Sequence, residues 1–67
     1  MVKEFKSFAD LPLVLEVDEI AAVLRISRAL AYEVLHQHGF PTVRIGKRMV
    51  VPRDAFIAWI HNQTHNV

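Results

Sequence analysis

A restart of helical periodicity near Ser27 is the feature that most constrains the fold of this chain. The apolar residues before it follow the i, i+3, i+4, i+7 spacing of one helix face: Val17, Ile20, Ala21 and Leu24. Ser27 is a favourable N-cap, and a second helical pattern begins directly after it. Two helices with so few residues between them cannot be collinear. The sequence therefore predicts a pair of short helices that meet at a steep angle.

The short length of the chain limits how it can be stabilised. A domain of 67 residues buries only about 60% of the surface that its unfolded chain exposes. Because there is no cysteine, neither a disulfide framework nor a thiolate zinc site is available, and side-chain packing must supply the stability. The apolar runs are far shorter than the roughly 18 residues that a membrane helix needs, and the first residues have no signal-peptide pattern. We therefore expect one domain, residues 1–67, of a soluble cytoplasmic protein.

The second helix is expected over about 27–36. Its inward face is predicted to consist of three apolar residues: Ala31, Val34 and Leu35. The small Ala31 lets the two helices approach closely. Gly39 is expected to be the left-handed residue at the helix end, and Pro41 prevents continuation. The helix-turn-helix is therefore placed within residues 16–38.

Residues 42–51 change from helical spacing to the alternation that is typical of strands. A basic turn, either Gly46-Lys47 or Gly46-Lys47-Arg48, is expected to join two strands of a hairpin. A last helix is expected over about 53–62, and the hairpin must lean on the helices because two strands alone are not stable. The buried stripe of this helix is predicted to be Phe56, Trp59 and Ile60.

The N-terminal residues 1–12 are expected to form an arm that ends at Pro12 and packs Phe5 and Phe8 against the body. A short extended segment, 13–15, follows it. The predicted fold class is mainly α with a small β-hairpin: a winged helix-turn-helix with a two-stranded wing and a C-terminal helix.

Charge is unevenly distributed along the chain. Residues 1–20 hold two bases and five acids, a net charge of −3, whereas residues 21–67 hold six bases and two acids, a net charge of +4. This asymmetry is consistent with a positive face that meets a polyanion. Chance scatter of charge in a small domain is the alternative explanation.

Arg28, in the first turn of the second helix, is the best candidate for reading a DNA base. Arginine bonds guanine O6 and N7 together, which is worth about 1–3 kcal/mol against a wrong base; a solvated helix-start arginine is the alternative. Ser27 is expected to contact phosphate besides capping the helix, and Tyr32 either contacts phosphate or packs its ring in the core. The full predicted DNA-binding set is Arg25, Ser27, Arg28, Ala29, Tyr32, Arg44, Lys47, Arg48 and Arg53.

Three bases concentrate charge on the hairpin: Arg44, Lys47 and Arg48. They are expected to neutralise phosphate or to enter the adjacent minor groove. The alternative is that they only protect the hairpin edge from aggregation.

No metal, cofactor, small-molecule ligand or enzymatic activity is expected. The histidines form two closely spaced pairs, His36 with His38 and His61 with His65, but neither cysteine nor a nearby carboxylate completes a site. No serine, histidine and aspartate are oriented around a pocket, for which a domain of this size has little room.

The order of these elements resembles the excisionase-type DNA-binding domains, which are related to the winged helix-turn-helix of the MerR regulators. The matching residues are Glu19-Ile20-Ala21, Leu24, Ser27-Arg28, Tyr32, Pro41, Val43-Arg44-Ile45-Gly46-Lys47-Arg48, Pro52-Arg53 and Trp59-Ile60. Members are small phage or transposon proteins and regulators, and the resemblance implies DNA binding through residues 27–36 and 42–51.

The resemblance further implies a sequence-specific protein that assists site-specific recombination or regulates transcription. Its partners would be double-stranded DNA and either a recombinase or integrase or further copies of itself. The alternative function is a protein-interaction module that uses the winged-helix scaffold without DNA.

Four positions depart from the pattern of that family. Glu16 replaces the usual Ser or Thr cap, which predicts a weaker start of the first helix. Arg25 replaces a glycine that is common in the turn, which predicts strain if the residue is left-handed. Leu30 and Glu33 replace a frequent Thr and a frequent base, which predicts weaker base contacts by the second helix.

Overall fold

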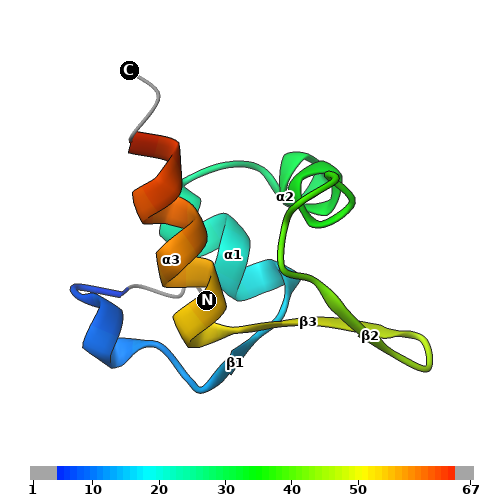
Figure 1. The fold of residues 1–67 in the computed structure, drawn as a ribbon, viewed down its shortest axis with the longest axis horizontal. Coiled ribbons are helices and arrows are strands. Elements are labelled where there is room, and N and C mark those ends of the chain that lie inside the picture. Colours follow the sequence, from blue (N-terminus) through cyan, green and yellow to red (C-terminus); the bar gives the residue numbers. More distant parts are fainter. Residues whose placement is uncertain (1–4, 65–67) are drawn as a thin grey trace.

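The computed structural model describes residues 5–64, whose helices and strands form a winged helix-turn-helix (Figure 1). The helices are α1 (Val17–Leu24), α2 (Arg28–Leu35) and α3 (Arg53–Gln63), and a 3₁₀ turn, η1, covers Phe8–Asp10. The strands are β1 (Val14–Leu15), β2 (Val43–Ile45) and β3 (Arg48–Pro52). In Figure 1, α1 lies in the centre, with α3 on one side and α2 and the β2–β3 hairpin on the other. The first four residues of the expected arm, and His65, lie outside the described residues.

The α1–α2 turn forms where the periodicity restarts, as predicted. Arg25 ends α1 in the left-handed conformation, with φ 58° and ψ 46°, and its N–H bonds to the carbonyl of Ala21. Ser27 then caps α2: its Oγ accepts a hydrogen bond from the backbone N of Leu30 at 3.1 Å. The fully buried Ala31 belongs to the apolar core, as expected of a small residue on the inward face of α2. Local capping chemistry therefore sets the bend between the two helices.

We expect Arg25→Gly to stabilise the protein by about 0.5–1 kcal/mol. A left-handed conformation costs an L-residue about 1–2 kcal/mol, and the larger unfolded-state entropy of glycine offsets part of the gain. Urea unfolding measures the change. Arg25→Ala is the control because it removes the same charge but keeps the Cβ strain. If both variants have the same stability, Arg25 is not strained.

The end of α2 differs from the prediction. The helix ends at Leu35, and Gly39, although left-handed with φ 92°, closes the turn that follows instead of capping the helix. The turn directs Phe40 into the core, where its ring packs edge-on against Phe56 and Trp59, with centroids 6.1 and 4.8 Å away. The earlier helix end therefore follows from tertiary packing of Phe40.

The predicted extended segment 13–15 contains a third strand, β1, whose pairing with the hairpin was not predicted. The strand order in the sheet is β1-β3-β2, and all pairs are antiparallel. In β1, Leu15 pairs with Val51 of β3, and both side chains are fully buried. Ile45 pairs with Arg48, so the hairpin turn is the two-residue alternative, Gly46-Lys47. Pairing with β1 anchors the base of the wing to the core, and the hairpin tip projects from the body (Figure 1).

The core lies between the three helices and the inner face of the sheet. Phe56 of α3 is fully buried in it, and Trp59 and Ile60 pack against it, which confirms the predicted stripe. Phe5 also packs against this core, and Phe8 contacts the ring of His61 edge-on at 6.0 Å. The described part of the N-terminal arm therefore folds back onto the body.

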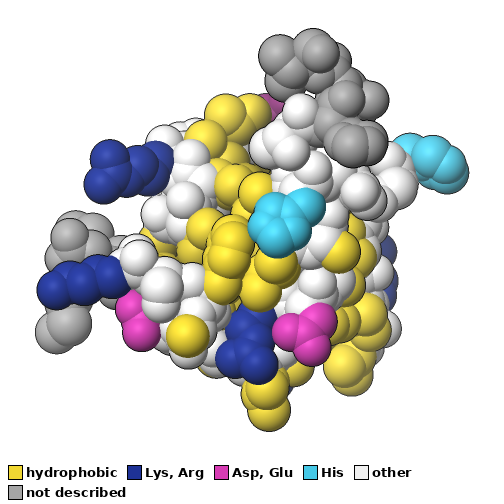
Figure 2. Space-filling view, turned by 60° about the vertical axis from the view of Figure 1, so that its left-hand side comes forward, with side chains coloured by type: hydrophobic (Ala, Val, Ile, Leu, Met, Phe, Trp, Pro, Cys, Tyr) yellow, Lys and Arg dark blue, Asp and Glu magenta, His cyan; other side chains and the backbone are white. Residues whose placement is uncertain are grey.

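Figure 2 shows the side of the molecule to the left of Figure 1. Apolar side chains gather in the middle of this face, and the basic side chains of the described residues lie singly around them. The candidate interface below is formed instead by α2 and the β2–β3 hairpin, on the right in Figure 1.

Candidate nucleic-acid interface

A cleft of about 200 Å³ lies between the start of α1, α2 and the tip of the β2–β3 hairpin. Its polar and charged lining residues are Glu16, Asp18, Arg28, Tyr32, Lys47 and Arg48. The cleft therefore brings together residues of the second helix and of the wing that the sequence predicts to bind DNA.

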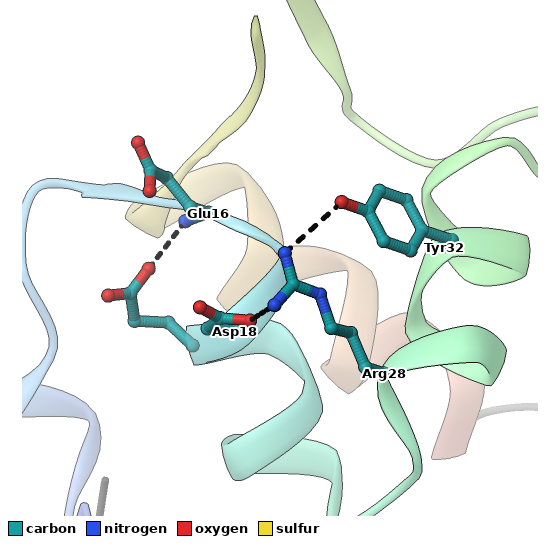
Figure 3. Close-up of polar contacts among 5 residues, drawn as sticks. Glu16, Asp18, Arg28 and Tyr32 are labelled. Atoms are coloured by element: carbon teal, nitrogen blue, oxygen red, sulfur yellow. Dashed lines mark hydrogen bonds and ion pairs between the residues drawn. The ribbon is translucent and has the colours of Figure 1, made fainter. Parts of the chain in front are cut away.

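Arg28 lies between two partners in this cleft (Figure 3). Its Nη1 is 3.2 Å from Oδ1 of Asp18, and its Nη2 donates to the hydroxyl oxygen of Tyr32 at 3.4 Å. The guanidinium carbon also lies 5.7 Å from the centroid of the Tyr32 ring. The Tyr32 hydroxyl, and then the Asp18 carboxylate, raise the pKa of Arg28 above its usual value. The side chain is exposed, so DNA can reach it.

The other predicted residues of α2 face solvent. Tyr32 is 38% exposed, so its ring is not a core residue. Ala29 is exposed, and Ser27 is exposed as well as being the N-cap. The capping interpretation of Ser27 is confirmed, whereas its contact with phosphate stays a prediction.

The wing presents its bases at and beside the turn. Lys47 lies in the turn and is exposed, and Arg48 forms an ion pair with Glu16 across the cleft. Arg44 pairs with Met49 in the strand register and therefore projects from the same face of the hairpin, the face with which Met49 lines the cleft. Lys47 and Arg48 thus line the cleft together with Arg28, whereas Arg44 is exposed in β2 and is not among the lining residues.

Arg25 and Arg53, like Ser27, Ala29 and Arg44, are predicted residues that do not line the cleft. Arg25 is exposed in the α1–α2 turn. Arg53 is only 28% exposed: its Nη1 donates to the carbonyl of Leu11 at 3.0 Å, and its Nε is 3.6 Å from Oδ1 of Asp54. Arg53 therefore holds the N-terminal segment against α3. DNA contact by these two residues stays a prediction.

Two site residues were missed from the sequence, Glu16 and Asp18. The first was expected to weaken the start of α1, where the structure instead forms a capping box. The Oε1 of Glu19 accepts from the backbone N of Glu16 at 2.7 Å, and the Glu16 side chain accepts from the backbone N of Glu19. The Glu16 carboxylate also pairs with Arg48. Asp18 lies in the first turn of α1, where a carboxylate suits the positive end of the helix dipole. Nothing in the spacing indicated that it contacts Arg28.

No three metal-ligating side chains are grouped within residues 5–64. No helix in that part of the chain is long and apolar enough to cross a membrane.

Comparison with protein-family models matches residues 14–64 to the helix-turn-helix domain family. The match begins at β1 and ends one residue after α3, so it contains both helices of the turn, the wing and the last helix. Comparisons with curated proteins and with solved structures gave no match. The family is one of DNA-binding domains and is typically non-enzymatic. With more than half of its length matched, the chain belongs to the helix-turn-helix domain family and is an excisionase-type DNA-binding domain.

Proposed function

We propose that this protein binds double-stranded DNA in a sequence-specific manner, with α2 in the major groove and the β2–β3 hairpin on the phosphate backbone or in the adjacent minor groove. The observation that carries the proposal is the cleft that Arg28 of α2 shares with Lys47 and Arg48 of the hairpin. A recognition helix next to a basic wing matches the docking geometry of helix-turn-helix proteins. Membership of a DNA-binding family supports it.

Each element has its own task in this proposal. Arg28 projects from the first turn of α2 and bonds guanine O6 and N7. Ala29 and Leu30, both exposed on α2, provide apolar contact for thymine methyl groups. The hydroxyls of Ser27 and Tyr32 contact phosphate and fix the position of the helix.

The proposed biological role is to assist site-specific recombination or to regulate transcription by occupying a site. A single module of this size buries about 600–1,000 Å² on DNA, which limits its affinity. Several copies on adjacent sites, or a recombinase bound beside the protein, would supply the missing contact area. Site selection from a random pool of duplexes identifies the preferred sequence.

Titration of that duplex at several salt concentrations tests DNA binding. If about four bases meet phosphate, log K falls with log salt with a slope of about −3 to −4. Arg28→Ala is expected to weaken binding to the selected site by about fivefold to 150-fold, equivalent to about 1–3 kcal/mol. Arg28→Lys keeps the charge and loses the paired bonds to guanine, so it should bind non-specific DNA like the wild type. Absence of binding to any duplex at low salt contradicts the proposal and favours a protein-interaction module.

A further inference from the structure

Two acidic side chains at the start of α1 occupy the arginines of the proposed DNA surface. Asp18 contacts Arg28 at 3.2 Å, and Glu16 forms an ion pair with Arg48. All four side chains line the same cleft and are more than half exposed. Figure 3 shows the guanidinium of Arg28 directed at the Asp18 carboxylate. One acid therefore pairs with the recognition helix and the other with the wing.

These acids nearly cancel the charge of the cleft. Its three bases, Arg28, Lys47 and Arg48, face two carboxylates, which leaves a net charge of +1. A DNA phosphate that approaches the cleft meets both signs of charge. The phosphate attracts the guanidinium groups and repels the carboxylates, which bind those guanidinium groups in the absence of DNA.

On DNA binding, the two arginines must therefore exchange their carboxylate partners for groups of the DNA. The N–H groups of Arg28 and Arg48 that bond to carboxylates are the groups that would donate to phosphate or to guanine. Because exposed ion pairs are weak, the exchange is readily made, but it lowers the net gain from each arginine. The cost applies to every duplex that engages both arginines, whatever its sequence.

We propose that Asp18 and Glu16 are intramolecular competitors of DNA, which set the affinity of the protein by holding Arg28 and Arg48 until DNA displaces them. The inference rests on the proposed DNA-binding function. By weakening binding to all duplexes, the carboxylates confine occupancy to sites whose base contacts add enough affinity. Discrimination between sites then comes from the base contacts alone.

The test compares Asp18→Asn, Glu16→Gln and the double variant in titrations of the selected duplex and of a random duplex. Each single variant is expected to bind both duplexes about two- to fivefold more tightly, and the double variant about tenfold more tightly. The ratio between the two duplexes stays within about twofold of the wild type, because the same exchange is removed from both. The gain in affinity of the variants over the wild type becomes smaller as the salt concentration rises from about 0.01 to 0.15 M, because the Debye length falls from about 30 to about 8 Å.

Asp10→Asn is the matched control. Asp10 is exposed in η1, does not line the cleft and forms no ion pair with a base of the proposed DNA surface among the described residues. It makes the same change in net charge and is expected to leave both affinities unchanged. Circular dichroism establishes that each variant is folded.

Two results contradict the proposed competition between the acids and DNA without contradicting DNA binding itself. If the Asp18 and Glu16 variants bind DNA no more tightly than Asp10→Asn, the two ion pairs do not oppose binding. Weaker binding to the selected duplex alone means that Asp18 positions Arg28 for base contact instead of competing for it. A wild-type protein that binds no duplex at low salt overturns the proposed function itself, and the inference with it.

Discussion

Replacement of Phe56 by alanine is expected to destabilise the protein by about 3–5 kcal/mol, the range measured for buried Phe to Ala changes in cores. Phe56 is fully buried, and its ring lies 6.1 Å from that of Phe40 and 6.5 Å from that of Trp59. At about 0.05–0.15 kcal/mol per residue, a domain of this length has only about 3–10 kcal/mol of stability. Urea unfolding followed by circular dichroism should therefore show that the variant has lost about a third or more of the wild-type stability, with a midpoint at much lower urea concentration.

Two variants separate the loss of core volume from other effects of the substitution. Phe56→Leu retains most of the volume and should lose much less stability than Phe56→Ala. Phe8→Ala removes the same ring from a side chain that is 38% exposed and should change the stability by less than about 1 kcal/mol. Cooperative unfolding of Phe56→Ala close to the wild-type midpoint would show that the α3 ring does not hold the core together.

The importance of Phe56 was predictable because it belongs to a helical stripe, whereas that of its partner Phe40 was not. Helices α1 and α2 were predicted with nearly correct bounds since caps and spacing are local properties of the chain. Phe40 lies in no periodic segment, and only tertiary packing determines that its ring enters the core. The misplaced end of α2 has the same origin.

The pairing of the third strand escaped prediction for a related reason. The two residues of this strand, Val14 and Leu15, have too little length for a pattern, and their partners Pro52 and Val51 are far away in the sequence. The pairing of the buried Leu15 with the buried Val51 depends on how the hairpin packs against the core. Non-local pairing of this kind leaves almost no signal in a single sequence.

The candidate site likewise has features that the sequence predicts and features that depend on the tertiary structure. The bases of α2 and of the wing were predicted because helix starts and hairpin turns are visible in the sequence. Their pairing with acids was not, because it depends on the angle between α1 and α2 and on a wing residue, Arg48, that is 32 positions from Glu16. The structure therefore adds two carboxylates that pair with arginines of the proposed DNA surface.

The wing makes a large contribution to affinity if it binds phosphate as proposed. Lys47→Ala/Arg48→Ala is expected to weaken binding about fifty- to hundredfold at about 0.1 M salt, because each lost phosphate contact removes nearly one logarithmic unit at that concentration. The slope of log K against log salt should become less steep by about two. Titrations of one duplex at several salt concentrations measure both quantities.

The two wing positions are expected to contribute unequally. Lys47 has no ion pair with another described residue, so Lys47→Ala removes one cation and nothing else. Arg48→Ala also removes the ion pair with Glu16 that DNA has to displace, so the net loss should be smaller than that of Lys47→Ala.

Lys6→Ala is the control for Lys47→Ala, since it removes one exposed lysine from the N-terminal segment before η1, on the side of the molecule opposite the wing tip (Figure 1). Its affinity and salt slope should equal those of the wild type. If Lys6→Ala and the wing variants weaken binding equally, the effect comes from net charge and not from a wing on the phosphates. An unchanged slope in the double variant would likewise remove the wing from the interface, and α2 alone would have to account for binding.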